Sequence, residues 1–346
     1  MINGQERFYG PLPPTSESNL QSNKKWHIQM KERSTPQRQL TQDVDETKRL
    51  RRKARDAKRE RQRLVSFDRA AKMNLARLQN QTGGKSGHFL SSSQQHHVGC
   101  SGWFYWHWRG TFYPEEIPRA DWFRHYTENF DTVELNAPFY SWPTLATVKT
   151  WIQQAKHAEN FVYTVKVSEL ITHVKQFART RELVLDFGFI ADLLGPQFGC
   201  FLFQLPPSFI YTPARLRAIV SQLDPTRRNV VEFRHPSWWN EAVYNAFRKH
   251  GIIFCSCSGP RLPDELIKTA DDIYVRFHGT SKWYRHDYTQ QQLDIWARRI
   301  RESGAKQSWI YFNNDWDGYA IKNAKELLSL LSGSKGTCAD YGSKDH

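Results

Sequence analysis

From residue 97 onward the chain alternates short apolar segments with amphipathic patterns, and this alternation restricts the fold more than any other feature. "YTQQQLDIWARRIRE" spaces Leu293, Trp296, Ala297 and Ile300 at i, i+3, i+4 and i+7, the period of a helix. Alternating strands and helices favour parallel pairing through right-handed crossovers. Eight such units in about 250 residues predict an α/β fold of the (β/α)8 TIM-barrel type. The predicted strands are 97–101, 131–136, 161–166, 198–204, 229–234, 252–257, 272–278 and 308–313.

A doubly wound open sheet is the alternative architecture, because it is also built from alternating strands and helices. Its dinucleotide-binding form carries a GxGxxG turn after the first strand. This chain has "VGCSGWFY" at that point, which lacks the motif. We therefore expect the barrel.

The basic charge of the chain is concentrated in its first 95 residues. They hold 20 Lys and Arg against 9 Asp and Glu, while all 346 residues carry a formal net charge of +14. We expect residues 1–95 to form a basic, low-complexity extension, largely disordered or helical, that ends in the flexible linker "TGGKSGHFLSSSQQHH". The barrel domain is then expected at 96–332 and a disordered tail at 333–346.

The densest basic stretch, "TKRLRRKARDAKRERQRL" at 47–64, is polar almost all round. Such a run is typical of nucleic-acid contact or of a nuclear-localisation signal, and a solvated helix without a dedicated partner has the same pattern. No apolar run approaches the roughly 20 residues that cross a bilayer, so we expect no membrane partner. The N-terminus lacks the apolar region of a signal peptide, and the five cysteines form no CxxC pair. These features predict a cytoplasmic protein, with the nucleus as the alternative.

Polar side chains recur at the ends of the predicted strands, two residues apart. In a barrel, the last inward-facing residues of the strands line the C-terminal mouth, where barrel enzymes place their sites. The sequence therefore predicts one polar ring at the mouth. It is formed by Glu134 and Asn136, Glu232 and Arg234, Arg276 and His278, and Asn313 and Asp315, with Lys166, His173 and Gln204 after strands three and four.

This ring predicts a pocket for an anionic group. The cations Lys166, Arg234 and Arg276 suit a phosphate or a carboxylate. A buried ion-pair network with a structural role would show the same pattern, but burying charges costs several kcal/mol per ion, which favours a functional site. The candidate catalytic residues are Glu134, Glu232, His278 and Asp315; the candidate substrate-binding residues are Asn136, Lys166, His173, Gln204, Arg234, Arg276, Asn313, Tyr140 and Trp103.

The barrel region contains, in order, "VGCSGWFYWHWRGTFYP", "VELNAPFYSWP", "VKVSELITH", "FLFQLPPSF", "VVEFRHPSWW", "YVRFHG" and "YFNNDWDGYAIKNA". This series resembles the YecE-like family, known as domain of unknown function 72, over residues about 97 to 331. The resemblance implies a TIM-type barrel and a family without an established activity. One departure lies at strand six, where many family members have an aspartate and this chain has Ser256 or Ser258.

Hydrolysis or lysis of an anionic substrate is the first of three candidate functions. Glu134 or Glu232 would act as the base, and His278 as acid or base. No cofactor is implied with certainty. A divalent metal ion is a variant of this hypothesis, although the chain has no HxH or HExxH spacing. Its ligands would be Glu134, His173, Glu232, His235, His278 and Asp315.

The other two candidates are a glycosidase and a binding protein. A glycosidase would use the two glutamates and the aromatic residues near the mouth, but strands two and five lie nearly across a barrel, which makes the short separation of a retaining pair hard to reach. A nucleic-acid or nucleotide-binding protein without turnover would stack bases on "GWFYWHWRG" and gain affinity from the basic extension.

Overall fold

The structure, a computed structural model, describes residues 18–80 and 95–333, with side chains from residue 45 onward. The chain divides between Arg61 and Gln62 into two compact units. Most of the predicted linker and all but the first residue of the predicted C-terminal tail lie outside the described residues. Strand β1 begins at Gln95, so the last three linker residues, including His96 and His97, belong to the barrel instead.

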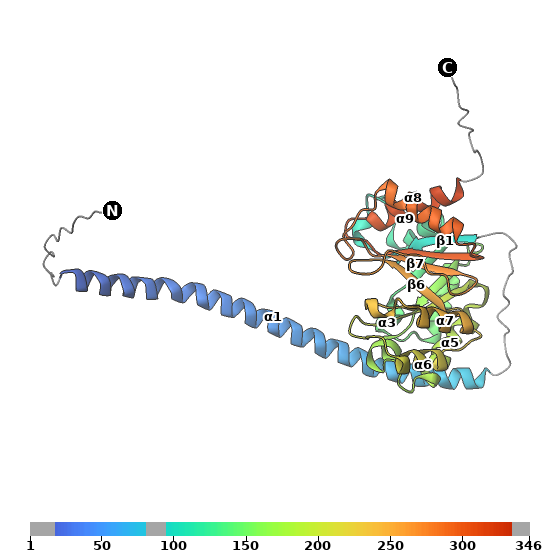
Figure 1. Ribbon diagram of the computed structural model, residues 1–346, viewed down its shortest axis with the longest axis horizontal. Coiled ribbons are helices and arrows are strands. Elements are labelled where there is room, and N and C mark those ends of the chain that lie inside the picture. The colour runs from blue at the N-terminus through green and yellow to red at the C-terminus, as the bar shows by residue number, and fades with distance from the viewer. Residues whose placement is uncertain (1–17, 81–94, 334–346) are drawn as a thin grey trace, which may run out of the picture. The chain divides into compact units, whose positions relative to one another are not determined.

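Eight parallel strands form a nearly closed barrel, as predicted (Figure 1). Their order is β1-β8-β7-β6-β5-β4-β3-β2, and each strand lies within two residues of its predicted position. Alternate side chains point inward, where a cluster that includes Tyr274, Trp309 and Tyr311 fills the barrel. The strands are β1 (Gln95–Cys100), β2 (Thr132–Leu135), β3 (Val162–Lys166), β4 (Phe198–Gln204), β5 (Asn229–Glu232), β6 (Ile253–Ser258), β7 (Ile273–Phe277) and β8 (Gln307–Phe312).

A tyrosine hydroxyl closes the barrel between β1 and β2. The Tyr126 hydroxyl accepts from the backbone N–H of Cys100 at 2.9 Å and donates to the backbone carbonyl of Thr132 at 3.0 Å. It stands where the described strands have no backbone ladder. Gly99 permits this close approach, because a Cβ there would lie 2.3 Å from the Thr132 carbonyl oxygen. The Tyr126 side chain thus joins the backbones of the two edge strands.

The helices pack on the outside of the strands, with α8 and α9 on one side and α5, α6 and α7 on the other (Figure 1). Threonine or asparagine side chains accept the N–H of the third helical residue where α4, α6, α7 and α8 begin, which fixes those starts. The helices are α2 (Trp122–Thr127), α3 (Ala137–Tyr140), α4 (Leu145–Gln154), α5 (Arg181–Leu194), α6 (Pro213–Gln222), α7 (Glu241–His250), α8 (Gln290–Glu302) and α9 (Tyr319–Ser332). Short helical turns lie at Trp106–Trp108, Arg119–Asp121, Leu170–Val174, Gly195–Gln197 and Pro236–Trp238.

The unit after β6 has no helix, which corrects the expectation of eight complete β/α units. Residues 259–272 run instead as a loop beside the strand. The Ser256 hydroxyl accepts from the backbone N–H of Ile267 at 2.8 Å, and the Thr269 hydroxyl accepts from the N–H of Phe254 at 2.9 Å. Ser256, one of the two serines at the family's aspartate position, therefore holds the loop that replaces the helix.

A long helix, α1 (Ser18–Gln79), precedes the barrel. Its last part, from Gln62, belongs to the barrel unit. There Ala70 and Met73 are buried, and Asn74 and Arg77 each donate to the buried Asp186 carboxylate on α5 at 2.9 Å. In the described part of the chain, no helix is both long and apolar enough to span a membrane.

Candidate functional site

The barrel strands place one inward-facing residue each at the C-terminal mouth. Period two carries the inner face of β7 from Tyr274 to Arg276, and that of β5 from Val230 to Glu232. The same alternation applies to the other strands. The resulting layer is Ser101, Glu134, Lys166, Gln204, Glu232, Cys257, Arg276 and Asn313.

Arg276 is the centre of this layer. Its Nη1 donates to Glu232 Oε2 at 2.5 Å, and its Nη2 donates to Glu134 Oε1 at 2.6 Å. Glu134 also accepts from the Ser101 hydroxyl at 2.8 Å and, through its second oxygen, from the Tyr274 hydroxyl at 2.6 Å. All these side chains are buried. Both predicted general bases are therefore tied to one guanidinium, which leaves Glu134 fully occupied by donors.

Glu232 is held by a second arginine as well. Arg234 Nε donates to Glu232 Oε1, and His278 Nε2 lies 3.4 Å from the same oxygen. Burial alone would raise the pKa of Glu232, but the charges of Arg234 and Arg276 hold it well below its usual value. Glu232 is thus ionised at neutral pH and buried between two cations. It is a counter-ion for the arginines more than an available base.

His278 is neutral in this setting. Burial lowers the pKa of His278 well below its ordinary value, and the charges of Arg234 and Arg276 lower it further. Arg234 Nη2 faces His278 Nε2 at 3.1 Å, and an arginine can only donate, so Nε2 accepts in this pair. Nδ1 lies 3.3 Å from the side-chain amide of Asn313. The imidazole is therefore a hydrogen-bonding partner of Arg234.

Lys166 differs from its neighbours because it lacks a partner. Its side chain is only 9% exposed, and its ammonium lies 4.2 Å from the centre of the Phe139 ring. No hydrogen bond or ion pair joins it to any described residue. Burial, followed by the charge of Arg276, lowers the pKa of Lys166 to about 7. The amine is therefore close to half protonated at neutral pH.

The charge balance at the mouth, together with burial, lowers the pKa of Lys166. Glu134 and Glu232 supply two negative charges, and Arg234 and Arg276 supply two positive charges. A protonated Lys166 adds a fifth charge without a counter-ion, inside a site where solvation is weak. These five side chains are together neutral when the amine is neutral, and they would accept one more anion when the amine is charged.

Arg234 offers a further donor without a partner among the described residues. Its Nε and Nη2 are taken by Glu232 and His278, and its guanidinium lies 4.4 Å from the centre of the Trp283 ring. No hydrogen bond joins its Nη1 to any described residue. Stacking and two bonds fix the plane of the guanidinium, so Nη1 is a preorganised donor.

Asp315 lies apart from the arginine cluster. Trp108 Nε1 donates to its two carboxylate oxygens at 2.9 and 3.0 Å, and His107 Nε2 lies 2.9 Å from one of them. Burial raises the pKa of Asp315. This carboxylate attaches the loop after β1 to the end of β8, a position that the spacing of Asn313 and Asp315 does not reveal.

The remaining candidates surround the mouth without joining the cluster. His173 packs edge-on against Phe139, the ring that also contacts Lys166. Gln204 donates to the neighbouring Leu205 carbonyl, and Asn136 stands just before α3. Tyr140 is exposed and Trp103 is half-buried among other aromatic rings.

The six predicted metal ligands are not brought together as a set, although Glu232 and His278 lie 3.4 Å apart. In the described residues, the group of three whose ligand atoms lie within 4.8 Å of one another is Glu232, Cys255 and Cys257. Only Glu232 belongs to the predicted set, and it contacts two guanidinium cations, which disfavour a metal ion beside it. Burial raises the pKa of Cys255 well above its usual value, so this thiol stays protonated.

Three residues of the mouth escaped the sequence-based prediction. Ser101 and Tyr274 both bond to Glu134, and both stand at inward positions that the two-residue period marks. Trp283 comes from the loop after β7. Its position over Arg234 could not be predicted from the two-residue period of the strands.

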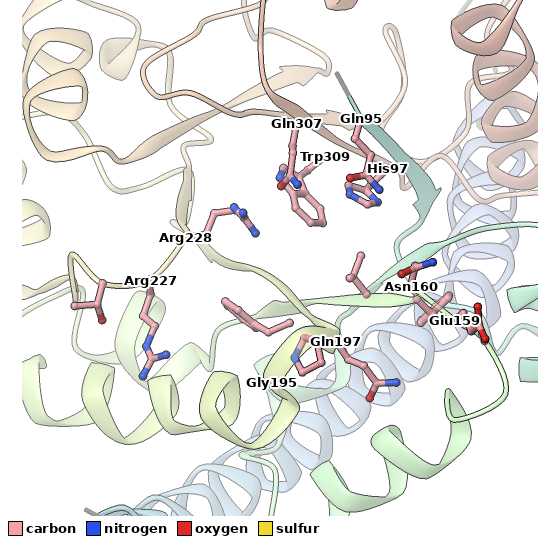
Figure 2. A pocket seen from close by; sticks show the side chains of 16 residues that line it. Gln95, His97, Glu159, Asn160, Gly195, Gln197, Arg227, Arg228, Gln307 and Trp309 are labelled. Carbon is pink, nitrogen blue, oxygen red and sulfur yellow. The ribbon is translucent and has the colours of Figure 1, made fainter. Parts of the chain in front are cut away.

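A cavity of about 540 Å³ lies at the opposite, N-terminal end of the barrel (Figure 2). His97 stacks on Trp309 there at 4.3 Å, and Arg228 approaches the same indole. The charge of Arg228 is matched by Asp272 at 2.8 Å. Because this end of a TIM barrel usually serves stability and the opposite end serves chemistry, we place the candidate site at the mouth.

Comparison with known proteins agrees with this fold. The family described as "Protein of unknown function DUF72" matches residues 97–344. UPF0759 protein YunF of Bacillus subtilis (strain 168) is 26% identical over 271 residues, which cover 68% of this chain and 94% of that protein. UPF0759 protein YecE of Escherichia coli (strain K12) is 25% identical over 236 residues, or 60% of this chain and 82% of that protein. The crystal structure of a DUF72 family protein from Thermotoga maritima MSB8 has a TM-score of 0.62 and 27% identity, and covers 68% of this chain and 99% of its own. The chain therefore belongs to the DUF72 family of proteins of unknown function.

Proposed function

We propose that the protein is an enzyme, a hydrolase or lyase, that acts on a small phosphate- or carboxylate-bearing substrate at the C-terminal mouth of the barrel. The observation that carries this proposal is Lys166, a buried amine that has no hydrogen bond or ion pair to any described residue and lies beside a charge-balanced cluster. A buried ionisable group without a partner costs stability. Groups of this kind gather at functional sites, where the shifted pKa serves a reaction.

The residue roles follow from the donors that remain unused. Arg234 Nη1 and the Lys166 ammonium form no hydrogen bond to any described residue, and they suit one anionic substituent. Lys166 is also the acid–base group, because its pKa of about 7 lies near physiological pH. Glu134 and Glu232 keep the arginines in place. This assignment moves the base from the glutamates to the lysine.

Proton-linked anion binding tests the proposal. Calorimetric titration of the full-length protein with sulfate at pH 7, in two buffers with different ionisation enthalpies, measures the protons taken up. Sulfate is fully ionised at this pH, so the protein must supply the change. We expect an uptake of less than one proton per sulfate, since a group with a pKa of about 7 is only partly protonated before the anion binds. The Lys166→Met variant should lose this uptake.

A matched control is Arg299→Gln, which removes an exposed arginine paired with Asp264 and should leave the uptake unchanged. No sulfate binding to the wild-type protein, or the same uptake in Lys166→Met, would contradict the proposal. Turnover is then followed by NMR on phosphorylated sugars and oxo acids. An enzyme loses turnover in Lys166→Met, whereas a binding protein shows none in either form.

A second candidate function is nucleic-acid binding through α1. Residues 47–64 hold ten basic and two acidic residues, and most of these side chains are exposed along one helix. Fluorescence anisotropy with a single-stranded DNA oligonucleotide should then show affinity that falls steeply between 50 and 200 mM salt, as expected for about four or more phosphate contacts. Replacing Arg51, Arg52 and Lys53 by Gln should weaken it, and Lys166→Met should not. Salt-independent or absent binding would exclude this role.

A further inference from the structure

The position of Lys166 at the mouth favours its uncharged amine. The amine lies at the end of a barrel strand, is nine-tenths buried, and has neither a hydrogen bond nor an ion pair to any described residue. A lysine that serves only as an anion contact needs exposure more than burial. Burial without a partner favours the uncharged amine, which is a nucleophile.

We infer that Lys166 is a covalent catalyst that forms an imine with the carbonyl carbon of an anionic aldehyde or ketone. This inference rests on the proposed function and narrows it: the reaction class becomes a lyase that breaks the carbon–carbon bond between the α carbon of that carbonyl and its substituent. The substrate class becomes an oxo acid or a phosphorylated carbonyl compound.

The chemical step balances with groups that are present. The Lys166 nitrogen lone pair forms the C–N bond, and the carbonyl oxygen leaves as water with one proton from the amine and one from solvent. The nitrogen keeps its second proton as an iminium cation. For a 3-oxo acid, the electron pair of the bond between the α carbon and the carboxylate forms a carbon–carbon double bond to the iminium carbon, the iminium nitrogen takes back its electron pair, and CO2 leaves with formation of an enamine. Protonation of the carbon and hydrolysis by water then release the product and the free amine.

The charges around Lys166 suit this sequence. Burial and the charges of Arg276 and Arg234 disfavour the ammonium, while the charges of Glu232 and Glu134 favour it. Once the imine forms, its positive charge takes the place of the ammonium, and the anionic group of the substrate at Arg234 is its counter-ion. The bound substrate therefore stabilises the cationic intermediate.

The two properties of Lys166 have opposite pH dependence. Anion binding weakens as pH rises through 7, because the ammonium is lost. Imine formation speeds up over the same range, because the free amine increases. At pH 7 about half of Lys166 is neutral, against about one in three thousand for a lysine with an ordinary pKa. Lys166 should therefore react faster than exposed lysines, which are almost wholly protonated at this pH.

Pyridoxal 5′-phosphate is a suitable probe, since it is an aldehyde with a phosphate group. The full-length protein is incubated at pH 7 with one equivalent, reduced with sodium borohydride, and digested for mass spectrometry. We expect the reduced adduct on the peptide that contains Lys166, and at least tenfold less adduct with pyridoxal, which lacks the phosphate. An excess of sulfate should block the labelling.

Two lysine variants and one control make the result decisive. Lys166→Arg keeps a cation but cannot form an imine, and Lys166→Met removes both, so both should lose the adduct. Lys306→Met, which removes an exposed lysine paired with Asp271, should keep it. Labelling spread evenly over the lysines, with sulfate binding and proton uptake intact, overturns the imine and leaves the proposed function standing. If the wild-type protein shows neither labelling of Lys166 nor sulfate binding, both the imine and the proposed function are overturned.

Discussion

The pKa of Lys166 is influenced by charged side chains with which it forms no ion pair. Two carboxylates are already neutralised by Arg234 and Arg276, so a third cation gains little from them. The protein retains an amine where an apolar side chain would pack without electrostatic cost. Stability and reactivity are therefore opposed at this position.

Lys166→Met is expected to stabilise the protein while abolishing turnover. Between pH 7 and 10.5 the unfolded chain holds the lysine proton and the native protein does not, so the wild-type free energy of unfolding rises with pH in this window. At pH 7 the variant should be more stable by about 2 kcal/mol or more. Urea denaturation at pH 7 and pH 9 measures both effects. A destabilised variant with an unchanged pH slope would mean that the ammonium is paired in the native state.

At the scale of elements, the barrel is closed by Tyr126 and Gly99 between β1 and β2. The hydroxyl satisfies one backbone N–H and one backbone carbonyl that would otherwise be buried without partners. The loop at 259–272 uses the same device, since serine and threonine hydroxyls satisfy backbone groups where a helix is absent.

Tyr126→Phe should lower the free energy of unfolding by about 1–3 kcal/mol, because it leaves two buried backbone groups unpaired. Tyr163→Phe is the control, since that hydroxyl donates only to the Trp151 carbonyl and its loss should cost less. Chemical denaturation of the two variants provides the comparison. Equal costs would show that Tyr126 contributes only its ring to the packing.

At the scale of the whole molecule, the sequence predicted the architecture well because a hydrophobic period is a property of the chain. It also placed Glu134, Glu232 and Arg276 together, because the carboxyl ends of parallel strands meet at one mouth. Which carboxylate binds which cation depends on side-chain reach and on loops. Asp315 was therefore expected at the site and is held by Trp108 instead. The missing helix after β6 depends on hydroxyl bonds that no periodicity records.

The unit boundary between Arg61 and Gln62 leads to a prediction from truncation. Removing residues 1–61 should leave the melting temperature of the barrel nearly unchanged. Removing residues 62–79 as well takes Asn74 and Arg77 from the buried Asp186, and should cost about 3–5 kcal/mol. Thermal unfolding of the two truncated proteins checks this. Equal melting temperatures would show that the end of α1 does not support the barrel.

The seam between β1 and β2 makes the barrel a rolled sheet rather than a continuous tube. A rolled sheet opens along its one weak line, and this line ends at the mouth between Ser101 and Glu134, which are hydrogen-bonded to each other and both contact Arg276. Separation of β1 from β2 would therefore weaken the contacts of Ser101 and Glu134 with Arg276 before it disturbed any helix. The Cys100 amide proton is hydrogen-bonded to the Tyr126 hydroxyl. Its hydrogen-exchange rate therefore reports how often β1 and β2 separate.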